Sequence, residues 1–218
     1  VDAHLFKRMR KRYVISATVQ ARLQKFGAIQ SNVLYPPPPQ RDYRHDEYGD
    51  YLFGVSRLAP LKRFDLVLRA LAEPIAAGIK CVIAGEGGEL DRLRALTYQL
   101  DIASRVKFIG RITDAQMIDH LARCRAVVFA PFNEDYGFVT VEAFMCGKPV
   151  ITCHDSGGPS ELVKDGESGF VTAPTPEAMA TAMRAVMDDR NLAARQGEAG
   201  ARVAKAMTWS AAIAELLR

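Results

Sequence analysis

From residue 50 onward, short apolar runs alternate with segments of helical periodicity. The apolar runs are rich in residues that favour strands and lie at 51–56, 81–85, 106–110, 126–131, 149–153 and 169–172. Between them, apolar residues recur about every 3.6 positions, which is typical of amphipathic helices. Strands that are apolar on both faces and alternate with helices form parallel sheets covered on both sides. The sequence therefore predicts an α/β fold with a doubly wound, parallel sheet of six strands.

The first 48 residues have a different character. A basic stretch at 4–12, expected to be helical, precedes a short strand at 13–17 and a helix at 18–27. Gly27 is suited to the end of that helix. Four consecutive prolines at 36–39 then require an extended, polyproline-like linker. We therefore divide the chain at about residue 48, into an N-terminal segment (1–48) and an α/β domain (49–218).

Composition narrows the class of protein. The 218 residues are 49% hydrophobic and 25% charged, and no apolar run reaches the ~20 residues of a membrane span. A net charge of +4 is too small to indicate nucleic-acid binding. The four cysteines form no C-x-x-C pair, and we interpret them as reduced core thiols of a cytoplasmic protein. The basic stretch 7–12 is compatible with contact to the inner face of an anionic membrane, and a solvated helix face is the alternative.

Ligands of doubly wound sheets bind at the carboxyl ends of the strands, so the loops that follow the strands are the candidate sites. Arg57 and Lys62 follow the first strand of the domain, beside the start of a helix. Two cations at a helix N-terminus favour a phosphate, and a solvated basic turn is the alternative. Gly85 follows the second strand, where we expect close approach of the backbone to a ligand. Leu90 stands where a dinucleotide fingerprint has its third glycine, so NAD is not expected.

The loop and helix after the fourth strand hold two carboxylates, Glu134 and Glu142, eight positions apart. Gly137 permits a tight entry into the helix, whose first amides, including those of Phe138 and Val139, are free for a ligand. Glu142 lies in an apolar run, and we expect it to face the ligand crevice, where two sugar hydroxyls would satisfy it. The alternative is a buried glutamate paired with a core arginine.

The loop after the fifth strand contains His154 and Asp155. These two residues have the chemistry of an acid/base pair. Residues of these types at a strand end more often cap the strand and solvate the loop, and we favour that interpretation.

Together these loops resemble the C-terminal domain of the retaining glycosyltransferases of family four (group 1), which have the GT-B fold of two Rossmann-like domains. The resemblance runs through GVSRLAPLKRFDLVLRAL, VIAGEGGELDRL, VKFIGRITD, EDYGFVTVEAFMCGKPVI and GGPSELVKDGESGFVT. It covers about residues 50–190 in the family's order and spacing. Residues 1–48 look like a remnant of the family's N-terminal acceptor domain plus the interdomain linker. The rest of that domain is expected to be absent from this chain.

The resemblance implies a role for each carboxylate. Glu142 would bind the ribose hydroxyls of a sugar nucleotide, and Glu134 would contact hydroxyls of the donor sugar beside the reacting carbon. Ile112, after the third strand, would lie near the base.

The resemblance also implies how the diphosphate is held. Arg57 and Lys62 would bind it together with the amides of Phe138 and Val139. A departing diphosphate needs its growing charge stabilised, by a metal or by fixed cations and amides. No convincing D-x-D element is visible, so we expect no metal and no other cofactor. Retention of configuration would use the leaving phosphate as the base, without a protein nucleophile.

Two features resemble the mannosyltransferase-like members of the family: YPP at 35–37 and the form EDYGFVTVEAF. They favour GDP-mannose as donor, with UDP- and ADP-sugars left open and the acceptor unknown. We therefore expect a hexosyltransferase of which this chain is the donor-binding half, inactive by itself. The alternatives are a sugar-nucleotide epimerase of the same fold and a non-catalytic nucleotide-sugar binding module.

Overall fold

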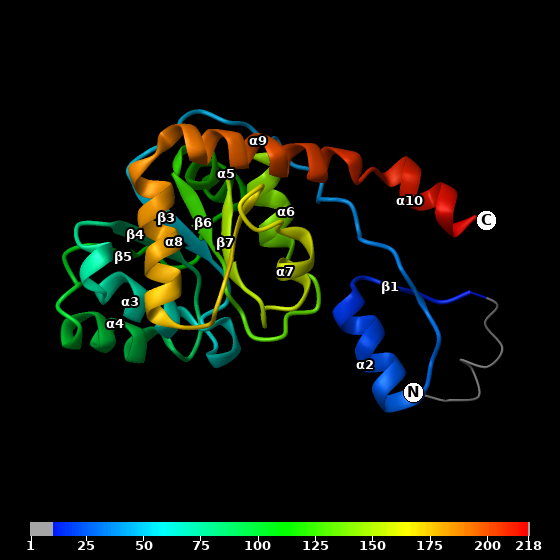
Figure 1. Cartoon of the computed structure of the whole chain (residues 1–218), viewed down its shortest axis with the longest axis horizontal. Helices are drawn as coiled ribbons and strands as arrows, with labels where there is room; N and C mark the ends of the chain where they lie inside the picture. Colours follow the sequence, from blue (N-terminus) through cyan, green and yellow to red (C-terminus); the bar gives the residue numbers. More distant parts are fainter. Residues whose placement is uncertain (1–10, 218) are drawn as a thin grey trace.

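The computed structural model describes residues 11–217, and its centre is one parallel sheet of six strands in the order β5-β4-β3-β6-β7-β8 (Figure 1). The first strand of this sheet, β3, lies in the middle. The next two strands are added on one side as far as β5, and the last three are added on the other side. This confirms the predicted doubly wound α/β fold. The strands are β3 (Tyr51–Val55), β4 (Lys80–Ala84), β5 (Val106–Phe108), β6 (Ala126–Val128), β7 (Val150–Cys153) and β8 (Gly169–Thr172).

Helices cover both faces of this sheet. The side chain of Leu52 in β3 packs into one core with α3, α4 and α8, and that of Phe53 packs into the other with α5, α6 and α7. The neighbouring residues of β3 thus point to opposite faces, as the pleat of a strand requires. The helices are α3 (Phe64–Ala72), α4 (Leu90–Gln99), α5 (Asp114–Arg123), α6 (Phe138–Met145), α7 (Gly158–Leu162), α8 (Pro176–Asp188), α9 (Arg190–Ala206) and α10 (Trp209–Leu216).

The first predicted helix of the domain, 64–78, divides at a proline. α3 ends at Ala72, and a short 3-10 turn, η2 (Pro74–Ala76), follows. Glu73 adopts an extended conformation because the proline ring that follows it disfavours helical geometry in the preceding residue.

The N-terminal segment forms a separate small unit. β1 (Tyr13–Val14) pairs in parallel with β2 (Asn32–Val33), and α2 (Ala17–Gly27) lies between them in the sequence. α2 begins at the capping side chain of Ser16, which shortens the strand predicted at 13–17. α2 ends at Gly27 as predicted, but the capping residue in left-handed geometry is Ala28, with a φ of 49°, and not Gly27. Most of the basic stretch 4–12 lies outside the described residues.

Several contacts tie this unit to the α/β domain, among them the ion pair of Arg22 in α2 with Asp135. The Glu161 carboxylate of α7 accepts hydrogen bonds from the amides of Ala17 and Thr18 at 2.8 and 2.7 Å, and from the hydroxyl of Tyr35 at 2.9 Å. At the other end of the chain, α9 and α10 run from the sheet toward β1 and α2 (Figure 1). The hydroxyl of Tyr13 donates to the carbonyl of Glu215 in α10.

The four cysteines are free and buried, which confirms their prediction as core thiols. No helix within residues 11–217 is both long and apolar enough to cross a bilayer.

Candidate functional site

The candidate site lies where the winding of the sheet reverses, at the carboxyl ends of β3 and β6. Ligands of open α/β sheets bind at this point because the flanking loops diverge and leave a crevice. A cavity of about 360 Å³ opens on one side of this point, at the carboxyl ends of β3, β4 and β5. It is lined by Val55, Ser56, Arg57, Gly85, Glu86, Arg111, Ile112, Thr113, Asp114 and Met117. Three of the predicted site residues, Arg57, Gly85 and Ile112, are therefore brought together.

Arg57 is the predicted phosphate ligand whose charge is available. It is exposed, and its guanidinium makes no hydrogen bond or ion pair within residues 11–217. A free guanidinium on a cavity wall is a site for an anionic ligand.

Gly85 has a structural reason to be glycine. Its φ is 133°, and a Cβ there would overlap the carbonyl oxygen of Ser56. The close approach predicted for this residue is thus made to the neighbouring loop, and Gly85 lines the cavity as part of that contact.

Lys62 and Glu134 form an ion pair across the switch point, Lys62 coming from the turn after β3 and Glu134 from the loop after β6. Their side chains are 16% and 24% exposed. The ammonium nitrogen of Lys62 also lies 5.8 Å from the ring centre of Phe129. The predicted phosphate-binding cation and the predicted sugar-binding carboxylate therefore neutralise one another here, and a diphosphate would compete with Glu134 for Lys62.

The start of α6 is set by Gly137, with a φ of 77°. A Cβ at this position would lie 2.8 Å from the Phe129 ring and 2.9 Å from Pro159, so a side chain does not fit. Gly137 also provides no side-chain cap. The amides of Phe138 and Val139 have no acceptor inside the helix because they lie in its first turn, and their role as ligands of an anion stays a prediction.

Glu142 is buried on α6, with 4% of its surface exposed, and its carboxylate pairs with Arg41 of the linker. The same guanidinium reaches Asp114 at 3.1 Å. The alternative of a buried glutamate paired with an arginine thus describes this structure, except that the arginine comes from the linker and not from the core. Because Asp114 lines the cavity, Arg41 connects the cavity to Glu142.

The surroundings of Glu142 are poorly solvated. Burial raises the pKa of its carboxyl group, and Arg41 partly opposes this. Burial and the nearby Glu142 charge also raise the pKa of Tyr43. The hydroxyl of Tyr43 is buried without a hydrogen-bond partner among the described residues. A buried polar atom without a partner is costly, so a ligand hydroxyl at this place would be favoured.

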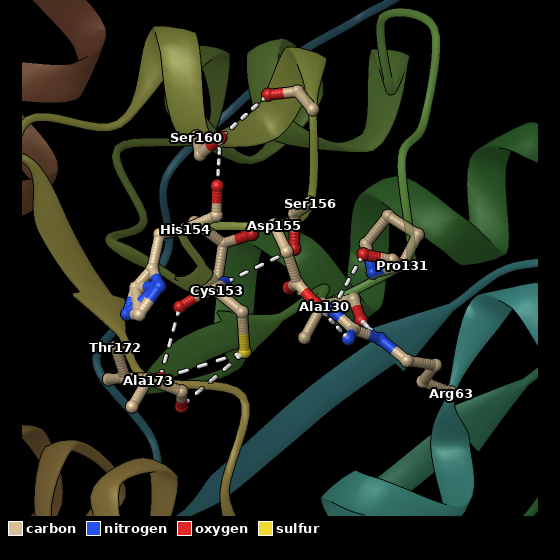
Figure 2. Close-up of polar contacts among 12 residues, drawn as sticks. Arg63, Ala130, Pro131, Cys153, His154, Asp155, Ser156, Ser160, Thr172 and Ala173 are labelled. Carbon is tan, nitrogen blue, oxygen red and sulfur yellow. Dashed lines mark hydrogen bonds and ion pairs between the residues drawn. The ribbon is translucent and has the colours of Figure 1, made fainter.

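His154 and Asp155 do not act as a pair. The Asp155 carboxylate accepts two hydrogen bonds from Arg63, at 2.7 and 2.6 Å (Figure 2). This contact lowers the pKa of Asp155. The backbone amide of His154 donates to the carbonyl of Thr172. Asp155 thus fixes a loop, in agreement with the interpretation favoured from the sequence.

Five charged residues at this edge escaped the sequence analysis. Arg111 and Asp114 flank Ile112 directly after a predicted strand, so their position alone could have identified them. Glu86 follows Gly85 in the same way. Arg63 follows Lys62 after a predicted strand, so its position is also visible in the sequence, although its partner lies 92 residues away. Arg41 has no comparable local signal, because it lies in the linker and its partner is 101 residues away.

No group of three or more His, Cys, Asp or Glu side chains in the part of the chain that the structure describes gathers as a set of metal ligands. The expectation that binding needs no metal stays a prediction.

The architecture and the position of these charges define a Rossmann-like domain with its charged side chains at the ligand-binding edge. Residues 40–203 match the family described as glycosyl transferases group 1. The match covers more than half of the chain, and the chain belongs to this family.

Curated relatives agree with the family. The chain is 33% identical over 175 residues to D-inositol 3-phosphate glycosyltransferase 2 of Catenulispora acidiphila, covering 75% of this chain and 41% of the relative. It is also 33% identical over 170 residues to D-inositol 3-phosphate glycosyltransferase of Streptomyces avermitilis, covering 72% and 36%. The chain thus spans about two fifths of the length of these relatives.

Solved structures share the fold. Anabaena Alr3699/HepE in complex with UDP and glucose has a TM-score of 0.83 at 25% identity, over 99% of this chain and 65% of that one. Sucrose-phosphate synthase from Thermosynechococcus elongatus has a TM-score of 0.86 at 20% identity, over 98% and 58%.

The contact between Arg41 and Glu142 leads to a stability prediction. Arg41→Ala leaves a buried carboxylate without its charged partner and raises the pKa of Glu142 further. A carboxyl group with a raised pKa stabilises the fold below its unfolded-state pKa of about 4.3, and this stability is lost as pH rises through the folded-state value. Urea unfolding should therefore show a loss on the order of 1–3 kcal/mol at pH 7. The loss should shrink toward zero below the unfolded-state pKa.

Arg44→Ala is the matched control. Arg44 lies in the same linker and pairs with Asp46 and Asp119, but it is exposed. Exposed pairs contribute little, so this variant should unfold like wild type at both pH values. If Arg41→Ala behaves in the same way, the pair with Glu142 does not stabilise the fold.

Proposed function

We propose that this chain is the donor-binding half of a retaining glycosyltransferase that transfers a sugar from a nucleotide-diphosphate sugar without a metal ion. The observation that supports this most is the arrangement of Arg57, Lys62, Glu134 and Glu142 around the carboxyl ends of β3 and β6. In this proposal, residues 1–48 belong to the acceptor-side domain and linker, and residues 49–218 form the donor domain.

In this proposal, the base and the ribose of the sugar nucleotide bind at the cavity end of the site. Ile112 contacts the base, and the ribose hydroxyls bind the Glu142 carboxylate. Both fit the site, because Ile112 lines the cavity and the unpartnered Tyr43 hydroxyl lies beside Glu142. Ribose hydroxyls can donate to the carboxylate oxygen of Glu142 and can bond the hydroxyl of Tyr43, which has no partner among the described residues.

The diphosphate binds between the cavity and the α6 N-terminus. Arg57, Lys62 and the amides of Phe138 and Val139 offer charge and hydrogen bonds from fixed positions. Fixed donors stabilise the charge that grows on the leaving diphosphate without reorganisation during the reaction. Glu134 then exchanges its contact with Lys62 for hydroxyls of the donor sugar. The leaving phosphate serves as the base for the acceptor, so no protein nucleophile is assigned.

Two observations bear on which base the donor nucleotide carries, and they favour different bases. YPP at 35–37 and EDYGFVTVEAF resemble mannosyltransferase-like sequences and favour GDP-mannose. Alr3699/HepE, at 25% identity, was solved with UDP and glucose, which favours a UDP-sugar. Titration of the chain with GDP and with UDP under the same conditions decides between them.

The relatives named above are glycosyltransferases, which supports sugar transfer over epimerisation. Four free, buried thiols support a reducing, cytoplasmic location.

The first prediction of this proposal concerns the ribose. Glu142→Gln keeps the shape of the side chain but weakens it as a hydrogen-bond acceptor, a loss of about 1.5–3 kcal/mol. We expect the affinity for nucleoside diphosphate to fall at least about tenfold in titration calorimetry, with the protein still folded. Glu198→Gln, an exposed position on α9, should bind like wild type. Unchanged affinity in a folded Glu142→Gln protein would rule out the ribose assignment.

The second concerns the diphosphate. Removal of both Arg57 and Lys62 by alanine should weaken the binding of nucleoside diphosphate at least about tenfold more than that of the uncharged nucleoside. The control replaces Lys80 and Arg184 by alanine, which changes the net charge by the same amount. These two residues pair with Asp50 and Asp188. If both ligands weaken equally, the two residues hold the fold and the phosphates bind elsewhere.

The third concerns metal and turnover. Affinity for the sugar nucleotide should be the same with and without EDTA, because cations and amides already oppose the diphosphate charge. The chain alone should nevertheless transfer no sugar, since transfer needs an acceptor held within about 3.5 Å of the reacting carbon and water excluded. Loss of binding in EDTA would refute the metal-free site. Sugar transfer by this chain with any donor and acceptor of a panel would refute the proposal that the chain is only the donor-binding half.

A further inference from the structure

Arg63 has an unusual backbone conformation. It lies between Lys62 and the start of α3, with a φ of 50° and a ψ of 39°. This left-handed geometry is unfavourable for a residue with a Cβ and is normally taken by glycine. The side-chain contacts of Arg63 compensate for the cost of this geometry, together with the hydrogen bond from its amide to the carbonyl of Pro60.

The guanidinium of Arg63 joins three loops (Figure 2). It makes the two hydrogen bonds to Asp155 described above, donates from Nε to the carbonyl of Ala130 at 2.8 Å, and donates from Nη2 to that of Pro131 at 2.9 Å. Arg63 follows β3, the two carbonyls follow β6, and Asp155 follows β7. The guanidinium is planar and donates to a carboxylate and two carbonyls at the same time. This makes the contact rigid, and the ammonium group of lysine cannot reproduce it.

Backbone hydrogen bonds continue this contact toward the donor site. The amide of Phe132 donates to the carbonyl of Leu61 at 2.7 Å, and that of Asn133 to the carbonyl of Asp155 at 2.9 Å. The amide of Glu134 donates to the carbonyl of Ser156 at 3.0 Å. The loop that carries Glu134 is therefore held between the loops of Arg63 and Asp155.

We propose that Arg63 is a positioning residue of the donor site, which sets the turn before α3 and the loop after β6 so that Lys62 and Glu134 face one another. This inference rests on the proposed function of that pair. Arg63 itself does not touch the ligand; it acts through its neighbour Lys62 on one side and through residues 130–134 on the other. In this proposal, Arg63 keeps its left-handed backbone geometry because this turn directs its guanidinium toward Asp155 and the side chain of Lys62 toward Glu134.

The test uses Arg63→Gly, since glycine adopts the left-handed conformation freely and only the guanidinium is lost. We expect nucleoside diphosphate to bind at least about tenfold more weakly, while the uncharged nucleoside binds within about twofold of wild type. Arg63→Lys should not restore the affinity. Asp155→Asn removes the same contact from the other side and should reproduce the effect. The double variant should be no weaker than either single one, because both act through one contact.

Arg184→Ala is the matched control. Arg184 also bonds two backbone carbonyls, those of Ile75 and Ala77, and one carboxylate, that of Asp188. It lies on α8, away from the candidate site. This variant should bind the diphosphate and the nucleoside like wild type, whatever its melting temperature. An Arg63→Gly protein that keeps the wild-type ratio of diphosphate to nucleoside affinity overturns the positioning role and leaves the proposed function intact.

Amide hydrogen exchange provides a readout that needs no ligand. In Arg63→Gly, the amides of Phe132 and Glu134 should exchange at least about tenfold faster than in wild type, and in Arg184→Ala they should not. If the wild-type chain binds no nucleoside diphosphate, the proposed function fails, and exchange alone then decides whether Arg63 orders this loop. Unchanged exchange at both amides overturns the inference.

Discussion

The parallel pairing of β3 with β6 is the constraint on which the site depends. All strands of the sheet run in the same direction, so every loop that follows a strand emerges at the same edge. Lys62 and Glu134 are 72 residues apart in sequence and meet only because their strands are neighbours. The same pairing brings the start of α6, which follows the loop of Glu134, to this edge of the sheet. The chemistry of the site is thus a consequence of strand order, as is usual for doubly wound folds.

The carboxylates at this edge share one electrostatic arrangement. Glu134, Glu142 and Asp155 each pair with a cation from a distant part of the chain, and each pair is at least partly shielded from water. Charges in such places are retained only when they are paired or hydrogen-bonded. A ligand that contacts one of these carboxylates or its cation must therefore exchange partners with an existing pair. Its affinity reflects the difference between the new contacts and the old ones.

The pairs differ in what they connect. Arg63 and Asp155 join loops of the same sheet, which suits a rigid support. Arg41 and Glu142 join the linker to α6, so the position of the linker affects the surroundings of this carboxylate. Further contacts of the linker, such as that of the Tyr48 hydroxyl to the carbonyl of Gly147 at 2.8 Å, hold its end against the domain. A ligand that displaced Arg41 from Glu142 would therefore remove one of the contacts that hold residues 41–48 against the domain.

The sequence by itself determined the type of fold, the number of strands and the loops that matter, because apolar periodicity and strand-end position are local properties. It overestimated some strands: 126–131 was predicted, but β6 ends at Val128, and the chain then turns through Pro131 and Asn133. It identified Glu134, Glu142, Arg57 and Lys62 as candidates from their positions after the strands, and the family resemblance added a role for each. Only the tertiary structure decided the partners of these residues. The contacts of Arg41 with Glu142 and of Arg63 with Asp155 depend on which loops the sheet brings together. A local sequence pattern does not indicate which distant residues become neighbours.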